Sequence, residues 1–205
     1  MEQINVVNIP FYKFKADKGL VEVIKTETSS LKYMSENTLE NGYVYPNFYH
    51  NELFKFFNKS IEQVKNLYYK SDIEFPIVDC WVNKYTTLNR LNKHKHSNSV
   101  ICGLYYVTSH TDLGATFFED KNPWNFENSN GINLSINKEN TETIHGSIFP
   151  EEGTLVLFPS NIAHYMRPIQ KISTVRYTIA FNTFPTGVIS NWRSSKLSIQ
   201  VKGND

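Results

Sequence analysis

The feature of this sequence that most constrains its fold is a change of pattern after Pro76. From that point, short runs rich in β-branched and aromatic residues alternate with clusters of Asn, Gly, Ser and Pro, as strands alternate with turns. The runs are IVDCWVNKY, SVICGLYYVTS, GATFFED, GTLVLFPS and STVRYTIAFNTF. We predict a strand in each of them, and many short strands of this kind indicate a β-sandwich or a β-barrel.

The segment before this change predicts helix. In LFKFFNKSIEQVKNLYY, apolar residues recur at helical spacing and define one face, which comprises Leu53, Phe57, Ile61, Val64 and Tyr68. A helix with an apolar face needs another surface to cover. Helices followed by many short strands therefore indicate an α+β protein, with the helices packed outside the β-structure.

The length of 205 residues suits one domain with a substantial core. We expect a single domain over 1–205, built from a helical and mixed support (1–75), a β-rich core (76–186) and a polar tail (187–205). The tail is expected to fray after Trp192. The polar, turn-rich stretch Lys121–His145 interrupts the core, and we interpret it as a long insertion of the kind that often forms a lid or a binding loop.

Charge and cysteine content argue against several classes of protein. Lys and Arg total 21 and Asp and Glu total 20, so the net charge of +1 gives no reason to expect a nucleic-acid-binding face. The stretch MEQINVVNIPFYKFKAD contains charged residues and no long apolar run, unlike a signal peptide or a membrane span. Cys80 and Cys102 lie in apolar runs and are expected to be buried, reduced thiols, which indicates a cytoplasmic protein.

Three histidines form the candidate site. His94 and His96 lie two residues apart before the run SVICGLYYVTS, and residues i and i+2 of a strand point to the same face. His164 follows a predicted strand that ends at Pro159 and a short turn. Together the three can form a facial metal triad that leaves positions open for a substrate and dioxygen. A His-x-His pair alone in a loop rich in Lys and Asn is more often solvated surface, so the interpretation depends on His164.

An arginine provides a second signal. Alternation along STVRYTIAFNTF separates an apolar face, expected to pack against the helices, from a face with Arg176, Thr178, Ala180 and Asn182. If that second face lines the interior, the buried guanidinium needs an anion, and its planar fork pairs best with a carboxylate. No acidic residue lies near Arg176 in the sequence, so a ligand carboxylate is the expected partner. If the face is open to solvent, Arg176 is an ordinary surface residue.

The order of these motifs resembles that of the Fe(II)/2-oxoglutarate dioxygenases, in particular the prolyl-hydroxylase-like branch and related oxygenases of phages and bacteria. The matching strings, which lie within about residues 78–184, are LYYVTS, LGATFFED, GTLVLFPSNIAHYMRP and VRYTIAFNTF. The resemblance implies a double-stranded β-helix (jelly-roll) core. It also implies Fe(II) as cofactor, 2-oxoglutarate as co-substrate, and hydroxylation of a substrate by dioxygen with release of succinate and CO2.

Residue by residue, the resemblance implies iron ligands at His94 and His164. It further implies that the distal carboxylate of 2-oxoglutarate is bound by Arg176, Thr178 and a strand tyrosine, for which Tyr106 fits the motif better than Tyr105. One departure stands out, because His96 occupies the position of the family's carboxylate ligand. The site therefore either has three histidines, or it receives an acid from elsewhere, with Asp112, Glu119 and Asp120 as candidates.

Two other functions remain open at this stage. One is a cupin-like three-histidine dioxygenase that does not use 2-oxoglutarate, and the other is a metal- or sugar-binding jelly roll without catalysis. A nucleophilic hydrolase is disfavoured because the chain has no G-x-S-x-G elbow. The substrate, a small molecule or a protein side chain, and the oligomeric state are left undetermined. The remaining histidines and one arginine are expected at the surface or in loops: His50, His110, His145 and Arg167.

Overall fold

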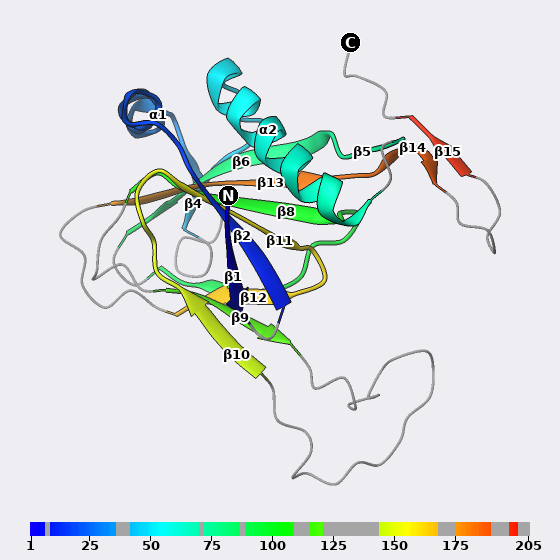
Figure 1. Cartoon of the computed structure of the whole chain (residues 1–205). Coiled ribbons are helices and arrows are strands. Elements are labelled where there is room, and N and C mark those ends of the chain that lie inside the picture. The colour runs from blue at the N-terminus through cyan, green and yellow to red at the C-terminus, as the bar shows by residue number, and fades with distance from the viewer. Residues whose placement is uncertain are drawn as a thin grey trace, which may run out of the picture.

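The computed structural model of the chain describes residues 1–6, 9–35, 42–69, 72–86, 89–108, 115–120, 144–167, 175–189 and 197–200. Its helices are α1 (Lys18–Ser30) and α2 (Asn51–Tyr68). Its strands are β1 (Glu2–Val6), β2 (Ile9–Lys15), β3 (Met34–Ser35), β4 (Tyr43–Tyr45), β5 (Ile73–Glu74), β6 (Ile77–Tyr85), β7 (Leu91–His94), β8 (Ile101–Tyr106), β9 (Thr116–Asp120), β10 (Ile144–Ile148), β11 (Thr154–Pro159), β12 (Ala163–Met166), β13 (Arg176–Thr183), β14 (Thr186–Ile189) and β15 (Leu197–Ile199). Figure 1 shows both helices on one side of the strands.

Two facing sheets form the core of the molecule. The larger sheet has eight strands in the order β1-β2-β11-β8-β13-β6-β4-β3, and the smaller has four in the order β10-β9-β12-β7. A third sheet, β15-β14-β5, has three strands and extends from the end of β13 (Figure 1). The two larger sheets make the double-stranded β-helix that the family resemblance implies, and each predicted apolar run contains one of the strands β6, β8, β9, β11 and β13.

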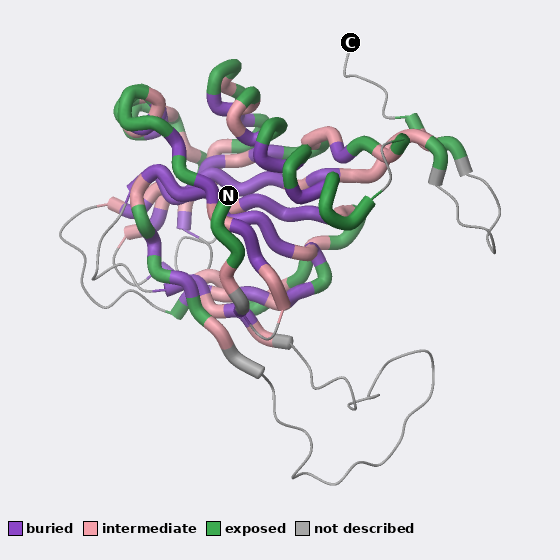
Figure 2. Tube along the Cα trace, viewed as in Figure 1, coloured by how far each residue is buried: buried purple, intermediate pink, exposed green. Residues whose placement is uncertain are grey.

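Helix α2 covers the outer face of the larger sheet (Figures 1 and 2). It begins after His50, whose Nδ1 accepts a hydrogen bond from the Leu53 backbone N–H at 3.2 Å. The predicted apolar face is confirmed for the residues that are buried there, which are Leu53, Phe57, Ile61 and Val64. Tyr68 lies on the same side, because its ring contacts Tyr12 of β2, but as the last residue of the helix it remains 55% exposed. The Phe57 ring packs on Tyr105 and Phe181, so the helix reaches β8 and β13 directly.

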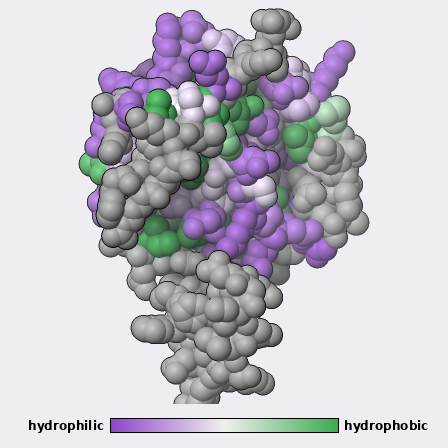
Figure 3. All heavy atoms as spheres, turned by 90° about the vertical axis from the view of Figure 1, so that its right-hand side faces the viewer, coloured by the Kyte–Doolittle hydropathy of each residue, from purple (hydrophilic) through white to green (hydrophobic). Residues whose placement is uncertain are grey.

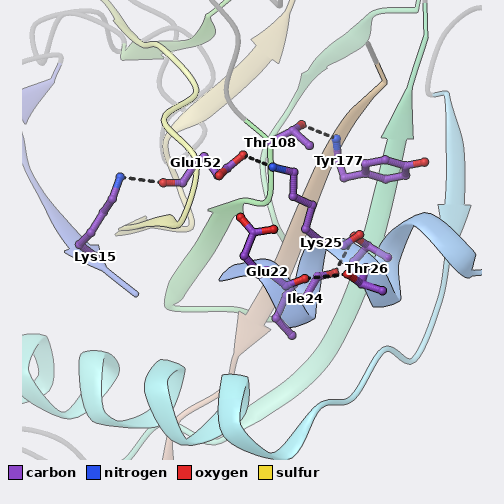
Figure 4. Close-up of polar contacts among 9 residues, drawn as sticks. Lys15, Glu22, Ile24, Lys25, Thr26, Thr108, Glu152 and Tyr177 are labelled. Atoms are coloured by element: carbon purple, nitrogen blue, oxygen red, sulfur yellow. Dashed lines mark hydrogen bonds and ion pairs between the residues drawn. The ribbon is translucent and has the colours of Figure 1, made fainter. Parts of the chain in front are cut away.

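Helix α1 is attached to the strands by charged side chains as well as by its apolar face. Asp17 caps its first turn by accepting a hydrogen bond from the Leu20 backbone N–H at 2.9 Å. Lys25 Nζ donates to Glu152 Oε2 at 2.8 Å, and Lys15 Nζ donates to the Glu152 carbonyl oxygen at 2.7 Å. Figure 4 shows the two lysines meeting Glu152 from opposite sides. Partly exposed ion pairs contribute little stability, so this contact mainly fixes where α1 lies relative to the turn before β11.

An aromatic cluster fills the space between the two larger sheets. The ring of Phe11 on β2 lies 4.8 Å from Phe118 on β9 and 5.5 Å from Phe158 on β11, and Phe118 and Phe158 are 5.2 Å apart. Phe158 also contacts the ring of His164, with 5.2 Å between the centroids. The cluster therefore separates the sheets on one side and forms a wall of the candidate site on the other.

The structure corrects the predicted organisation at both ends of the chain. The region 1–75 is more than a support, because β1, β2, β3 and β4 extend the eight-stranded sheet. The predicted fraying after Trp192 was wrong for Leu197–Ile199, which forms β15 and pairs with β14. The insertion predicted over Lys121–His145 lies outside the described residues except at its end, where Ile144 and His145 belong to β10.

Apolar residues on the described surface lie in separate small groups. On the face shown in Figure 3, hydrophilic residues cover most of the described area and hydrophobic residues lie between them in small groups. Among the helices that the structure describes, none is both long and apolar enough to cross a membrane. Cys80 and Cys102 are buried free thiols, as predicted.

Candidate active site

Three histidines meet at the end of the four-stranded sheet. His94 is the last residue of β7, His96 follows the end of that strand, and His164 lies in β12 directly opposite His94. One ligand atom from each ring lies within 4.8 Å of the others, and the Nε2 atoms of His96 and His164 are 3.3 Å apart. The pair was expected at the start of the run that forms β8, but β7 is a separate strand of the other sheet. The expectation that the three imidazoles converge is confirmed.

Backbone carbonyls orient two of the imidazoles. His94 Nδ1 lies 2.8 Å from the Asn92 carbonyl oxygen, and His164 Nδ1 lies 3.3 Å from the Ile162 carbonyl oxygen. A carbonyl oxygen can only accept, so each Nδ1 carries the proton and each Nε2 keeps a lone pair. This hydrogen-bonding pattern is the usual one for a histidine that binds a metal through Nε2.

Burial favours the neutral form of His96 and His164. It lowers the pKa of His164 to about 3, with further lowering from His94 and His96 nearby. Burial and His94 lower the pKa of His96 to about 4, although a hydrogen bond with Asn182 acts in the opposite direction. His96 also stacks on the indole of Trp81, with ring centroids 5.8 Å apart and planes at 19°. Neutral imidazole is the form that coordinates metal ions, so the donor set suits a first-row divalent cation such as Fe(II).

Arg176 lies at the other end of the same interior. It is 2% exposed on β13, and its guanidinium lies over the rings of Tyr85 and Tyr106, each at 5.6 Å. Nη2 donates to Thr116 Oγ1 at 3.1 Å, and Nη1 lies 2.8 Å from Met166 Sδ. Burial lowers the pKa of the guanidinium, and the two tyrosines act against that change. The prediction that Arg176 faces the interior is confirmed, and the alternative of a solvent-exposed arginine is excluded.

Thr178 and Tyr106 lie beside Arg176, as expected. Thr178 is the next residue on the same face of β13 and pairs with Tyr106 of β8, and both are buried. Tyr106 Oη donates to Thr116 Oγ1 at 2.9 Å, and Asn83 Nδ2 lies 3.5 Å from Thr178 Oγ1. Tyr105 points to the opposite face of the sheet, where its ring packs on Phe57 of α2. The preference for Tyr106 over Tyr105 therefore agrees with the direction of the two side chains.

One cavity of about 60 Å³ connects the histidines with the arginine. Its walls come from both larger sheets, since β7, β9 and β12 face β6, β8, β11 and β13 across it. The lining residues are Trp81, Asn83, Tyr85, Leu91, His94, His96, Cys102, Gly103, Leu104, Thr116, Phe158, His164, Met166, Arg176, Thr178 and Ala180. The arrangement places a cluster of imidazole nitrogens at one end of a narrow interior and the guanidinium of Arg176 at the other.

The structure also bears on the acidic residues considered as a third ligand. Among the described residues, the group that could hold a metal consists of the three histidines. Glu119 alternates with Thr116 and Phe118, which face the interior, and its carboxylate pairs instead with Lys93 at 2.8 Å. Asp112 and the side chain of Asp120 lie outside the described residues.

Several residues of the cavity were missed from the sequence. Trp81, Asn83 and Tyr85 alternate along β6, and the same period of two that was applied to β13 would have placed them together. Met166 lies two residues after His164 on β12 and would have been found in the same way. Thr116 lies in the matching string LGATFFED, but no role in the site was assigned to it from the sequence.

His50 and Arg167 are not members of the histidine cluster. His50 caps α2, and its Nε2 lies 3.7 Å from Glu27. Arg167 is exposed, and its guanidinium lies 4.5 Å from the centre of the Phe117 ring. His110 and the side chain of His145 lie outside the described residues.

A double-stranded β-helix whose interior holds a histidine cluster and a buried arginine is suited to bind one metal ion together with an anionic ligand. A sequence profile described as "Putative 2OG-Fe(II) oxygenase" matches residues 79–182, which is half of the chain. The chain belongs to this family of Fe(II)- and 2-oxoglutarate-dependent oxygenases. Fe(II) is accordingly its cofactor and 2-oxoglutarate its co-substrate. A search of curated proteins found no match to the sequence.

Solved structures share the fold at low sequence identity. A prolyl-4-hydroxylase from Pseudomonas putida is 11% identical with a TM-score of 0.58, over 85% of this chain and 92% of that one. HygX from Streptomyces hygroscopicus, with nickel and 2-oxoglutarate bound, is 13% identical with a TM-score of 0.58, over 86% and 83% of the two chains. A Trichoplax adhaerens prolyl hydroxylase in complex with a hypoxia-inducible-factor peptide is 14% identical with a TM-score of 0.56, over 85% and 83%.

Proposed function

We propose that the protein hydroxylates a substrate with dioxygen, Fe(II) and 2-oxoglutarate, releasing succinate and CO2. The observation that carries this proposal is a single cavity with convergent imidazoles at one end and a buried guanidinium at the other. When bound, the iron and 2-oxoglutarate supply the activation of dioxygen and the oxidative decarboxylation. The protein supplies the binding groups, their orientation and the exclusion of water.

His94, His96 and His164 would hold the metal through Nε2. The donor set fits Fe(II), because imidazole suits iron and the Nδ1 atoms of His94 and His164 are engaged by backbone carbonyls. A site with a neutral imidazole at position 96 keeps one more positive charge than a site with a carboxylate there. It should therefore favour anionic groups of the co-substrate.

Arg176, Thr178 and Tyr106 would bind the distal carboxylate of 2-oxoglutarate. The guanidinium provides a fixed charge with a planar fork of donors, and two buried hydroxyl groups lie beside it. Because this end of the cavity is lined by Tyr85, Leu91 and Met166, a charge-assisted hydrogen bond formed there is protected from competing water.

The substrate is a small molecule or a protein side chain. Relatives by fold support both kinds, since one HygX structure contains hygromycin B and the Trichoplax adhaerens enzyme is in complex with a peptide. We also propose that residues 1–205 form one domain, because strands from the beginning of the chain join the same sheet as β13. The buried free thiols of Cys80 and Cys102 support a cytoplasmic location.

The sequence also left open a cupin-like dioxygenase that does not use 2-oxoglutarate. The family match and the buried Arg176 disfavour that enzyme, and the three histidines alone do not distinguish the two. The decisive experiment incubates the purified protein anaerobically with Fe(II) and 2-oxoglutarate and then adds oxygen. We expect the wild-type protein to form succinate slowly even without the substrate, and we expect the Arg176→Met variant to form none. Oxygen consumption without any succinate would favour the cupin-like enzyme.

A further inference from the structure

The side chain of Met166 stands against Arg176 inside the cavity. Its Sδ lies 2.8 Å from Arg176 Nη1, while Thr116 Oγ1 lies 3.1 Å from Nη2. A thioether sulfur is a weak acceptor, whereas a guanidinium pairs most strongly with a carboxylate through two parallel hydrogen bonds. A carboxylate that binds Arg176 through Nη1 therefore competes with the sulfur for this donor and lies against the side chain of Met166.

The register of β12 fixes where Met166 lies along the cavity. Met166 follows His164 by two residues, so both side chains face the interior, about 7 Å apart along the strand. Met166 pairs with Leu91 of β7 and with Thr116 of β9, and it is 2% exposed. It packs with Tyr85 and Leu91 in a small apolar cluster. Met166 is therefore held at the level of the guanidinium, one step beyond the histidines.

We propose that Met166 determines the length of the 2-oxo diacid that the cavity accepts. The inference rests on the proposed function, in which the 2-oxo acid group lies at the histidines and the distal carboxylate lies at Arg176. The cavity has a volume of only about 60 Å³, so one additional methylene group must be accommodated by displacing a lining side chain. Met166 is the unbranched, flexible side chain in contact with Nη1, so it is the group that an additional methylene displaces.

The test compares 2-oxoglutarate with 2-oxoadipate, which is longer by one methylene group. Calorimetry with the Ni(II)-loaded protein measures the two dissociation constants without turnover. A pocket that distinguishes two ligands by one methylene typically does so by about 10–200-fold. We expect the wild-type protein to prefer 2-oxoglutarate within this range, and Met166→Ala to reduce the preference by at least about 10-fold.

Two further variants make the result interpretable. Met166→Leu conserves volume and should keep the wild-type preference, whereas Met166→Val removes less volume than alanine and should give an intermediate one. Circular dichroism checks the fold of each variant, and Met166→Val carries the test if Met166→Ala does not fold. An unchanged preference in the smaller variants, or an equal loss in Met166→Leu, overturns the inference alone. A wild-type protein that binds neither diacid overturns the proposed function and this inference together.

Discussion

His94, His96 and His164 offer a metal three similar nitrogen atoms, but they are held in different ways. Backbone carbonyls orient His94 and His164, and Trp81 packs against the ring of His96. Two of the three rings lie in β-strands of one sheet, so their separation is set by strand pairing. The loss of any one ring should therefore affect metal binding without disturbing the pairing of β7 with β12.

We expect His94→Ala and His164→Ala each to lose most of the affinity for Fe(II), Mn(II), Ni(II) or Co(II). Each substitution removes a nitrogen donor, and the remaining two cannot complete a facial triad. Metal titration followed by calorimetry measures the effect. His50→Ala is the matched control, because His50 caps α2 and lies outside the cluster. Unchanged metal affinity in both cavity variants would contradict the assignment of the site.

His96→Asp distinguishes direct coordination from an indirect role. If His96 coordinates the metal, aspartate can replace it, because a carboxylate is an acceptable iron ligand, and we expect Fe(II) binding to persist. If His96 only supports the other ligands, even His96→Ala should reduce affinity by no more than about 10–100-fold. Complete loss of metal from a folded His96→Asp protein, with folding checked by circular dichroism, would show that position 96 lacks the geometry of the family's acidic ligand.

Arg176→Met should weaken the binding of 2-oxoglutarate to the Ni(II)-loaded protein by at least roughly 2 kcal/mol. The buried carboxylate loses a charge-assisted hydrogen-bond partner and gains none. Metal affinity should stay within a few fold of the wild type, since Arg176 lies at the opposite end of the cavity. Arg167→Met removes an exposed guanidinium and should change neither affinity. Equal affinity for 2-oxoglutarate in Arg176→Met and wild type would place the co-substrate elsewhere.

At the scale of elements, close packing in the middle of the larger sheet restricts which residues can stand there. Gly103 of β8 pairs with Phe181 of β13, and the Phe181 ring covers the glycine on the side that faces α2. A Cβ atom placed on Gly103 would lie 2.1 Å from Phe181 Cζ, well inside van der Waals contact. The ring is itself fixed by Phe57, so it has little room to move.

We expect Gly103→Ala to lower the free energy of unfolding by about 1–3 kcal/mol, as overpacking of a core does. Urea denaturation followed by circular dichroism measures the change. The double variant Gly103→Ala with Phe181→Leu should recover part of the loss, because leucine leaves space for the new methyl group. Additive losses in the double variant would show that the ring of Phe181 is not the obstacle.

The elements that could be predicted are those whose own residues carry the pattern. Strand β6 coincides with the run IVDCWVNKY, and the buried face of α2 follows from helical spacing. Strand β7 could not be predicted, because LNKH is short and polar and becomes a strand only through its pairing with β12. Strands β14 and β15 were missed for the same reason. Their composition does not indicate a strand, and they form one through pairing with each other and with β5.

At the scale of the whole molecule, the main residues of the candidate site could be predicted from the sequence, whereas the way the two sheets face each other could not. The convergence of His94, His96 and His164 and the inward direction of Arg176 followed from motif order and alternation. Met166 and Thr116 contact the guanidinium because β9 and β12 lie opposite β13. Which strands face each other depends on the whole fold, so these contacts could not be predicted from a local stretch of sequence.

The aromatic cluster between the sheets should be a main source of stability. Phe11 is fully buried and contacts Phe118 and Phe158, so Phe11→Ala leaves a cavity that the rigid sheets cannot close. We expect the free energy of unfolding to fall by about 3–5 kcal/mol. Phe149→Ala, at a position that is 66% exposed, is the matched control and should change it by less than about 0.5 kcal/mol. Similar urea midpoints for the two variants would contradict this account of the core.

The division of the cavity between two sheets has a consequence for how such a protein changes over time. The histidines belong to β7, β12 and the turn after β7, whereas Arg176, Thr178 and Tyr106 belong to the eight-stranded sheet. The distance between the two halves is set by Phe11, Phe118 and Phe158, none of which is charged or coordinates anything. A change of ring size in this cluster would shift metal and carboxylate positions relative to each other. Selection on co-substrate use can therefore act on purely hydrophobic residues that bind neither the metal nor the carboxylate.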